Sequence, residues 1–176
     1  MNLTLVPVGE IHDVPDLMRE LSPALLLPQN TPVETEFQGT RSELSTDNQT
    51  TAEYLCAVAN RCQTGVHEVF AACLGDMAIG LSWMTTSRTT HPDSVPQTSP
   101  NLSTFIAYPW QRRGYGLGSL LLCLQIAEER YDSQAWTLVR KDNNPSRAMV
   151  KKAGLRLAAH DASVPADSDL FVYGSA

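Results

Sequence analysis

One segment constrains the fold more than any other: an apolar run, a glycine-rich loop and an amphipathic stretch in direct succession. Residues 102–107 form the apolar run and are typical of a strand, and residues 108–118 contain two arginines and three glycines. From Leu117 to Ala127, apolar residues recur at helical spacing. Glycines allow a sharp turn and a close approach of backbone N–H groups, and a helix start adds free N–H groups and a positive dipole end. The segment therefore predicts a strand–loop–helix unit that binds an anion, most often a phosphate or pyrophosphate.

The remaining patterns predict further strands and helices around this unit. Apolar runs predict strands at 3–8, 66–73, 77–84, 135–140, 156–159 and 170–173. Helical spacing and capping signals predict helices from about residue 14, over 50–62, from 117 to about 131 and over 145–153. Gly75 and Asp76 form the turn of a hairpin, and the proline-containing residues 22–48 and 85–100 are predicted to be irregular. Such an order indicates a mixed α/β domain around one sheet.

Length and composition favour one soluble domain over residues 1–176. The 43% hydrophobic and 18% charged content is typical of a globular protein. No apolar run reaches the roughly 20 residues that cross a bilayer, and the first residues do not resemble a signal peptide. The four cysteines lack metal-ligand or disulfide spacing, so we expect no metal site and buried thiols in the cytoplasm.

The net charge of −6 is unevenly distributed. Residues 110–156 contain nine basic and four acidic side chains, a net charge of +5, whereas the rest of the chain carries −11. The basic segment surrounds the glycine loop and suits a polyanionic ligand, and the acidic remainder suits a cationic second substrate. Ordinary surface charge explains the acidic remainder equally well. The acidity argues against nucleic-acid binding, which needs a basic face.

Three kinds of phosphate loop are candidates for the glycines. A dinucleotide-binding loop needs a third glycine where Ser119 stands, and the Lys-Ser/Thr ending of a nucleotide-binding P-loop is absent. The third candidate is the acyl-coenzyme A loop of the GCN5-related N-acetyltransferases, Gln/Arg-x-x-Gly-x-Gly/Ala between a strand and a helix. The chain resembles it in two registers, 111–116 and 113–118. We prefer the second register, because Ser119 and the leucines after it then fall at the helix start.

A second motif strengthens this resemblance. Residues 139–155 are similar to the later segment of the same family, with Asn143 eleven residues before Gly154 and Lys152 two residues before that glycine. The two motifs together cover about residues 102–155. The resemblance implies a single domain of mixed α and β structure, in which a mostly antiparallel, splayed central sheet is flanked by helices.

The resemblance also implies acetyl-CoA as co-substrate and assigns residues to it. Backbone groups of the strand end would hold the pantetheine arm and the thioester carbonyl: Phe105, Ile106, Ala107 and Tyr108. Backbone N–H groups of the loop would hold the pyrophosphate: Arg113, Gly114, Tyr115, Gly116, Leu117, Gly118 and Ser119. Arg112 and Arg113 would add ionic contacts. Asn143 would either bind the pantetheine or hold the end of its strand in place.

Catalysis in this family is direct attack of a neutral amine on the thioester, which needs a proton acceptor and a donor for the leaving thiolate. Val150 stands where many members have a proton-donating tyrosine. The chain instead resembles the branch of ribosomal-protein N-terminal acetyltransferases, in which a serine faces the sulfur, and Ser146 is therefore the candidate acid. A helix-capping role for this serine is the alternative. The identity of the general base is left open. A chain of waters would suffice, and the candidate side chains are those of His67, Glu68, His91, Asp161, Asp167 and Asp169.

The sequence thus predicts an N-acetyltransferase that acts in a ternary complex, as a monomer or homodimer, on a small-molecule amine or a peptide N-terminus. A catalytically silent acyl-CoA-binding module is the first alternative, because Val150 cannot donate a proton. A nucleotide-binding oxidoreductase is a weaker third hypothesis. The irregular residues 22–48 and 85–100 are expected to shape the acceptor pocket.

Overall fold

The strand–loop–helix unit predicted from the sequence is present in the computed structural model, which describes residues 2–8, 68–86, 91–131 and 134–174. Strand β4 (Asn101–Ile106) leads through a single 3-10 turn, η3 (Tyr108–Trp110), into helix α6 (Tyr115–Arg130). The elements before and after this unit are β1 (Leu3–Pro7), β2 (Glu68–Leu74), β3 (Met77–Thr85), β5 (Ala135–Arg140), α7 (Asn144–Lys152), β6 (Arg156–Leu157) and β7 (Ser168–Tyr173). The helices predicted before residue 63 and the irregular stretch 22–48 lie outside the described residues.

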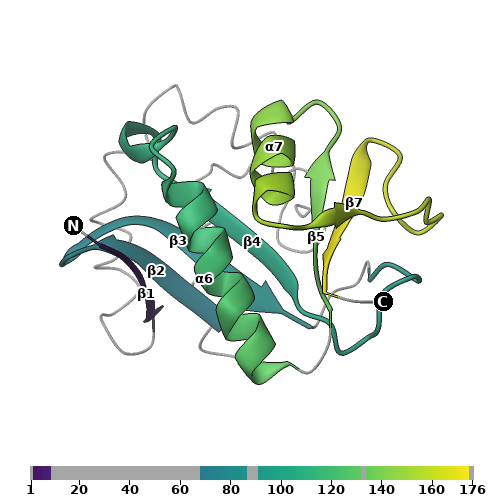
Figure 1. Cartoon of the computed structure of the whole chain (residues 1–176), viewed down its shortest axis with the longest axis horizontal. Helices are drawn as coiled ribbons and strands as arrows, with labels where there is room; N and C mark the ends of the chain where they lie inside the picture. Colours follow the sequence, from purple (N-terminus) through teal and green to yellow (C-terminus); the bar gives the residue numbers. More distant parts are fainter. Residues whose placement is uncertain (1, 9–67, 87–90, 132–133, 175–176) are drawn as a thin grey trace, which may run out of the picture.

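The seven described strands form one sheet in the order β1-β2-β3-β4-β5-β7-β6 (Figure 1). Every neighbouring pair is antiparallel except β4 and β5, which are parallel. β4 pairs with β3 over six residues but with β5 only at Asn101, opposite Trp136. The predicted sheet, mostly antiparallel and splayed at its centre, is confirmed.

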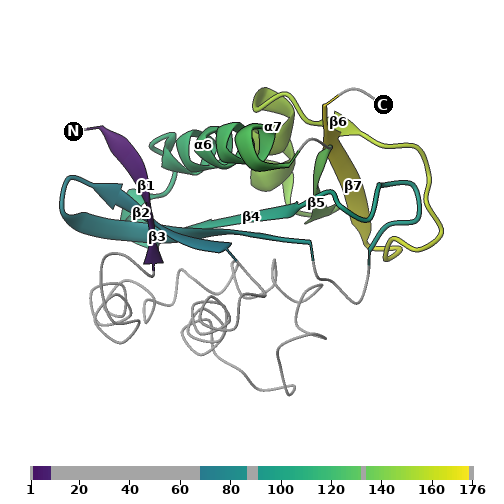
Figure 2. The ribbon, with the colours of Figure 1, turned by 90° about the horizontal axis from the view of Figure 1, so that it is seen from below.

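Helices α6 and α7 lie on the same face of the sheet (Figure 2). The stripe of α6 that packs on the sheet consists of Leu120, Cys123, Leu124 and Ala127, each at most 3% exposed. We expected Leu121 to lie on this stripe as well, from the helical spacing of the apolar residues, but it is 47% exposed. A helix turns by about 100° per residue, so Leu121 falls at the margin of the stripe while Cys123 falls within it.

A close approach between β3 and β4 holds the C-terminal end of β4 against β3. A Cβ atom on Gly80 would lie 2.1 Å from the carbonyl oxygen of Phe105, so the backbones can approach only because this residue is glycine. Past the end of the strand, the Ala107 N–H still donates to the Ile79 carbonyl at 2.9 Å. The C-terminal end of β4 therefore stays bound to β3 and separates from β5.

The segment after β5 follows the predicted order with small changes in length. α7 begins one residue before the predicted 145–153 and ends one residue earlier, and Gly154, with φ of +95°, terminates it. β6 has two residues rather than the predicted four. Ala158 still donates to the Leu170 carbonyl, but the chain then turns away into a loop whose Asp161 accepts hydrogen bonds from Ser94 and Ser163.

Candidate active site

The divergence of β4 and β5 opens a cleft under the two helices. Beyond the pair Asn101–Trp136, the strands share no further register pair, and α6 and α7 flank the gap on one side (Figure 1). The cleft is lined by residues from all four elements and from the turn before α7: Leu102, Ser103, Thr104, Leu120, Thr137, Leu138, Val139, Arg140, Asn143, Ser146, Met149 and Val150.

The closed end of the cleft is fixed by Trp136, which is fully buried. Its backbone N–H donates to the Pro100 carbonyl at 3.0 Å and its indole N–H to the Ser99 carbonyl at 3.1 Å. The side chain of Asn101 donates to the Trp136 carbonyl at 3.3 Å. These bonds hold the starts of β4 and β5 together, so the gap widens toward the carboxyl ends of both strands.

The cleft lies earlier on β4 than the segment predicted to hold the pantetheine. Phe105, Ile106 and Ala107 are buried and do not line it. The Ala107 N–H is bonded to β3, and the Ile106 carbonyl accepts a hydrogen bond from the Gln111 side chain at 2.8 Å. Because backbone groups alternate in direction along a strand, the Ala107 bond to β3 directs those of Thr104 toward β5. Backbone contacts to a ligand in the cleft are thus expected at Leu102 and Thr104.

The glycine loop ends earlier than the preferred motif register requires. Helix α6 starts at Tyr115, and the Gly118 N–H already donates to the Gly114 carbonyl at 2.9 Å. Among the three glycines only Gly114 has a positive φ, at +87°. The preference for register 113–118 was therefore wrong, and the register from Gln111 to Gly116 fits the structure.

The other two loop glycines do not have a positive φ and lie close to side chains of neighbouring elements. A Cβ atom on Gly116 would meet the Met149 sulfur on α7 at 3.1 Å, and one on Gly118 would meet the Leu3 side chain at 2.8 Å. These glycines let the first turns of α6 approach its neighbours closely. The sequence could not distinguish this role from ligand binding.

No side chain among the described residues caps the start of α6. Gly114 provides no side-chain cap, and the first turn contains no acidic residue. An α-helix cannot itself bond its first N–H groups, here those of Tyr115, Gly116 and Leu117. They carry the positive end of the helix dipole, which favours a bound anion. Of the seven predicted amides, those of Gly118 and Ser119 belong to the helix instead.

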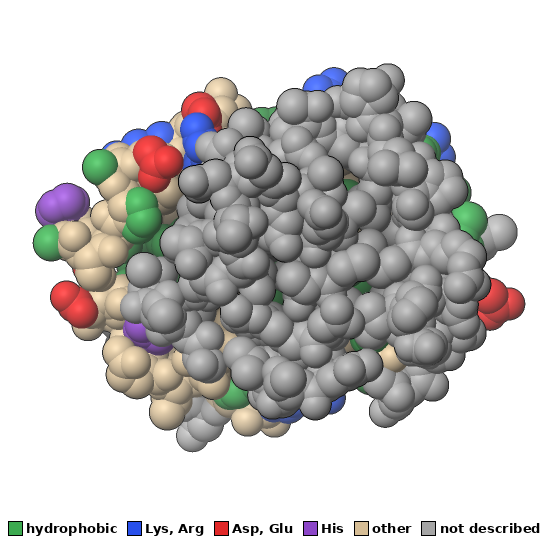
Figure 3. Space-filling model, turned by 180° about the vertical axis from the view of Figure 1, so that it is seen from behind, with side chains coloured by type: hydrophobic (Ala, Val, Ile, Leu, Met, Phe, Trp, Pro, Cys, Tyr) green, Lys and Arg blue, Asp and Glu red, His purple; other side chains and the backbone are tan. Residues whose placement is uncertain are grey.

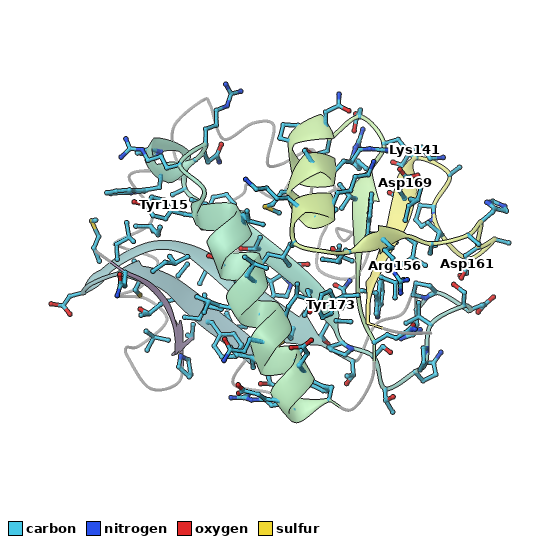
Figure 4. The ribbon with its side chains drawn as sticks, in the orientation of Figure 1. Tyr115, Lys141, Arg156, Asp161, Asp169 and Tyr173 are labelled. Carbon is cyan, nitrogen blue, oxygen red and sulfur yellow. The ribbon has the colours of Figure 1, made fainter. Side chains whose placement is uncertain are left out.

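One of the two loop arginines packs against an aromatic side chain. The guanidinium of Arg113 lies 5.3 Å from the ring centre of Trp110, and this ring makes an edge contact with Tyr115 at 6.3 Å. Figure 4 shows Tyr115 at the N-terminal end of α6. Arg112 and Arg113 are both exposed, and the backbone of Arg112 has a positive φ of 58°. Two cationic groups thus accompany the uncapped helix start.

Ser146 lies in the wall of the cleft, and the capping of α7 falls to another residue. The Asn143 side-chain oxygen accepts a hydrogen bond from the Ser146 N–H at 3.1 Å, so Asn143 is the N-cap. Val150, 2% exposed, contributes only carbon atoms to the same wall. Ser146 is therefore the residue of α7 that brings a hydroxyl group to the cleft.

The described candidates for the base have other partners and do not line the cleft. Glu68 accepts hydrogen bonds from Arg130 and Tyr131 at the far end of α6, and burial, together with Glu68, raises the pKa of Tyr131 to about 12. Asp169 pairs with Arg147, and Asp167 lies 3.9 Å from Arg140.

The other two described candidates belong to the loops before β4 and β7. The Asp161 carboxylate accepts hydrogen bonds from the hydroxyl and N–H groups of Ser163 and Ser94, and these bonds lower its pKa. Asp161 thereby links the two loops. His91 packs against Trp136 at 5.2 Å. His67 lies outside the described residues.

Charged side chains on the described surface are mixed in sign. Figure 4 shows Lys141 near Asp169, at the end of β7, while Asp161 lies farther out on the loop before that strand. On the described part of the opposite face, acidic and basic groups stand next to one another (Figure 3). Within the described residues, no three metal-ligating side chains come together, and neither helix is long and apolar enough to cross a membrane.

Comparison with solved structures identifies the fold. No protein-family model matches the sequence, and no curated protein does. The aminoglycoside acetyltransferase AAC(6')-Ib, in complex with coenzyme A, superposes with a TM-score of 0.66 at 12% identity, over 96% of this chain and 94% of its own. The ribosomal L7/L12 alpha-N-protein acetyltransferase RimL, also with coenzyme A, gives 0.64 at 13% identity, over 98% and 94%.

A third similar structure is the spermidine N-acetyltransferase from Vibrio cholerae in complex with CoA and spermine. It gives a TM-score of 0.63 at 12% identity, over 97% of this chain and 92% of its own. The likeness spans nearly the whole of each chain. The protein therefore has the fold of the GCN5-related N-acetyltransferases, as its two motifs predicted.

Proposed function

We propose that this protein is an acetyl-CoA-dependent N-acetyltransferase acting on a primary amine. One observation carries the proposal: a cleft between two parallel strands that share a single register pair, flanked by a helix with an uncapped start. Such a gap leaves strand amides and carbonyls for a ligand, and the helix start offers N–H groups to a phosphate. An elongated ligand with an anionic group and a narrow arm fits both features.

Acyl-coenzyme A has this form. Its pyrophosphate would accept hydrogen bonds from the N–H groups of Tyr115, Gly116 and Leu117, with Arg112 and Arg113 as ionic partners. Its pantetheine arm would enter the cleft between β4 and β5, where Leu102–Thr104 and the residues of β5 form the walls. We also propose that residues 1–176 form a single domain.

In the reaction, the nitrogen lone pair of a neutral amine attacks the thioester carbonyl, the C–N bond forms and the C–S bond breaks. A strand N–H of the cleft would stabilise the oxyanion that forms between these steps. The amine loses one proton, and the departing thiolate gains one. Ser146, on the cleft wall, is the proposed donor to the thiolate. Because the described carboxylates that were candidate bases are engaged elsewhere, water is the proposed first acceptor of the amine proton.

The acceptor is proposed to be a small-molecule amine or a peptide N-terminus. The structural neighbours carry names that refer to a ribosomal protein, an aminoglycoside and spermidine, all of which offer amines. We further propose a cytoplasmic protein, monomeric or homodimeric. Cys73 and Cys123 are both buried, and buried cysteines of this kind suit a reducing compartment.

The test is acceptor-dependent release of free thiol from acetyl-CoA across a panel of polyamines, aminoglycosides and peptides with free N-termini. We expect release with at least one acceptor, together with saturable CoA binding by calorimetry. NADH in place of CoA serves as the control ligand and is expected to give no thermal stabilisation. An absence of CoA binding would contradict the proposal.

A catalytically silent acyl-CoA-binding module is the second candidate. It is favoured by Val150, which supplies only carbon atoms to the cleft, and by the absence of a described carboxylate from the cleft walls. Tight CoA binding without thiol release for any acceptor would establish this second function.

A further inference from the structure

A threonine of the cleft takes part in a buried polar chain that the proposed reaction does not use. Thr104 lies on the β4 wall, and its hydroxyl oxygen is 2.8 Å from that of Ser82 on the neighbouring β3 strand. The two residues stand directly opposite each other in the β3–β4 ladder. Side chains of such cross-strand pairs contact one another, so Ser82 restricts the rotamer of Thr104.

The chain of contacts continues into the core. Ser82 is fully buried, and its side chain faces the thiol of Cys123 on α6, which is also fully buried. Burial raises the pKa of this thiol to about 12, and Ser82 opposes only part of that shift. The thiol therefore stays neutral at physiological pH. Ser82 thus anchors the Thr104 hydroxyl, and both Ser82 and the Cys123 thiol behind it are neutral groups that solvent does not reach.

The surroundings of Thr104 on the helix side of the cleft are largely apolar. Leu102, Leu120 and Val150 are each at most 2% exposed, and Met149 adds a thioether. A pantetheine arm contains two amides and ends in a thioester, and a polar group moved from water into such walls needs a hydrogen-bond partner. A hydroxyl has one donor and two acceptor positions, so Thr104 keeps capacity beyond its bond to Ser82.

We propose that Thr104 binds the pantetheine–thioester arm through its hydroxyl group and that Ser82 is the positioning residue that fixes this hydroxyl. The inference rests on the proposed acyl-CoA function and adds a side-chain contact on the β4 wall, across the cleft from Ser146. It gives a role to the fully buried Ser82 and the half-buried Thr104, whose hydroxyl groups would be costly to remove from water without hydrogen-bond partners.

The test compares ligands with and without the arm. For Thr104→Val, which keeps the side-chain shape, we expect CoA and acetyl-CoA to bind about three- to tenfold more weakly, the range for one neutral hydrogen bond. Adenosine 3′,5′-bisphosphate lacks the arm, and its affinity is expected to stay unchanged. Thr104→Ser keeps the hydroxyl and is expected to bind all three ligands within about twofold of the native affinity.

Two further variants separate binding from stability. Ser82→Ala leaves the Thr104 hydroxyl in place but unanchored, and we expect a smaller loss, about twofold to threefold, again confined to ligands that carry the arm. Thr4→Val makes the same chemical change at an exposed residue of β1, at the far edge of the sheet, and is expected to change no affinity. If Thr104→Val does not fold, Ser82→Ala decides the question through the same comparison of ligands.

The outcomes are distinguishable from failure of the proposed function. If the native protein binds none of the three ligands, both proposals are overturned. If the native protein binds them and Thr104→Val binds them equally well, only the role of Thr104 is overturned. Equal weakening of all three ligands would reduce Thr104 to a structural residue and overturn the inference as well.

Discussion

The two helices that cover the sheet begin in different ways. At α7, the Asn143 side chain accepts the Ser146 N–H, and Pro145 in the first turn has no N–H to be bonded. At α6, Gly114 has no side chain to offer, and no acidic residue follows in the first turn. The first turn of α7 is satisfied within the chain, whereas the start of α6 has no side-chain cap among the described residues. Of the two helix starts, the uncapped one is therefore the proposed anion site.

Placing a negative charge at the uncapped start is the most severe test of this comparison. For Gly116→Glu we expect CoA affinity to fall at least 100-fold, about 3 kcal/mol. The new side chain would collide with Met149, and its carboxylate would occupy the position favourable to a phosphate. Calorimetric titration with CoA measures the effect. Leu121→Glu, on the exposed side of the same helix, is the matched control. Native affinity in a folded Gly116→Glu variant would refute the loop assignment.

The second prediction concerns the hydroxyl that α7 brings to the cleft. If Ser146 donates a proton to the thiolate, Ser146→Ala should lower kcat about 100-fold, the lower end of what a general acid contributes. CoA affinity should stay within about twofold, because the change affects the transition state rather than ligand binding. Asn144→Ala, at an exposed neighbour in the same turn, should leave kcat unchanged. An unaltered kcat in Ser146→Ala would remove the serine from the mechanism.

The third prediction addresses the capped helix start. Asn143→Ala should lower the free energy of unfolding by about 1 kcal/mol, the usual contribution of an N-cap, as measured by urea denaturation. Asn143→Asp keeps the acceptor oxygen and should retain native stability. This second variant also separates the two predicted roles of Asn143. Reduced CoA affinity at unchanged stability would identify its amide group as a contact to the pantetheine.

The smallest effect is expected at the other end of α6, where Arg130 and Tyr131 bind Glu68. The folded protein raises the pKa of Tyr131 from 10.0 to about 12, so this tyrosine contributes stability fully below pH 10 and loses it as the pH rises toward 12. Tyr131→Phe should cost less than about 1 kcal/mol at pH 7, because Glu68 keeps Arg130. Between pH 10 and 12, the free energy of unfolding should fall more steeply for the native protein than for the variant. Parallel curves would contradict the assignment.

Local patterns in the sequence predicted most of the described elements. The strand before the glycine loop, the helix after it, the hairpin around Gly75 and the terminating Gly154 all depend on residues close together in the chain. The resemblance supplied the splayed sheet, which no local pattern encodes. The motif register was wrong because a glycine that lies close to a neighbouring side chain, such as Gly118, looks the same in sequence as one required for a turn.

The partners of the polar side chains could not be predicted. Glu68 was a candidate base by strand position, yet it pairs with residues more than sixty positions later, at the end of α6. The Ser82–Thr104 pair depends on the register of two strands joined through a long loop. Such contacts are set by tertiary packing. Two residues of the same type, such as Asp161 and Asp169, therefore acquire unrelated partners.

The single register pair between β4 and β5 also affects how a ligand can enter and leave. Beyond Asn101 and Trp136, widening the gap breaks no ladder hydrogen bond between these strands, because none spans it. Widening the gap would therefore leave the antiparallel pairing on each side of it intact. Entry or release of a long, narrow ligand would then require side chains along the cleft walls to move, without breaking hydrogen bonds between strands.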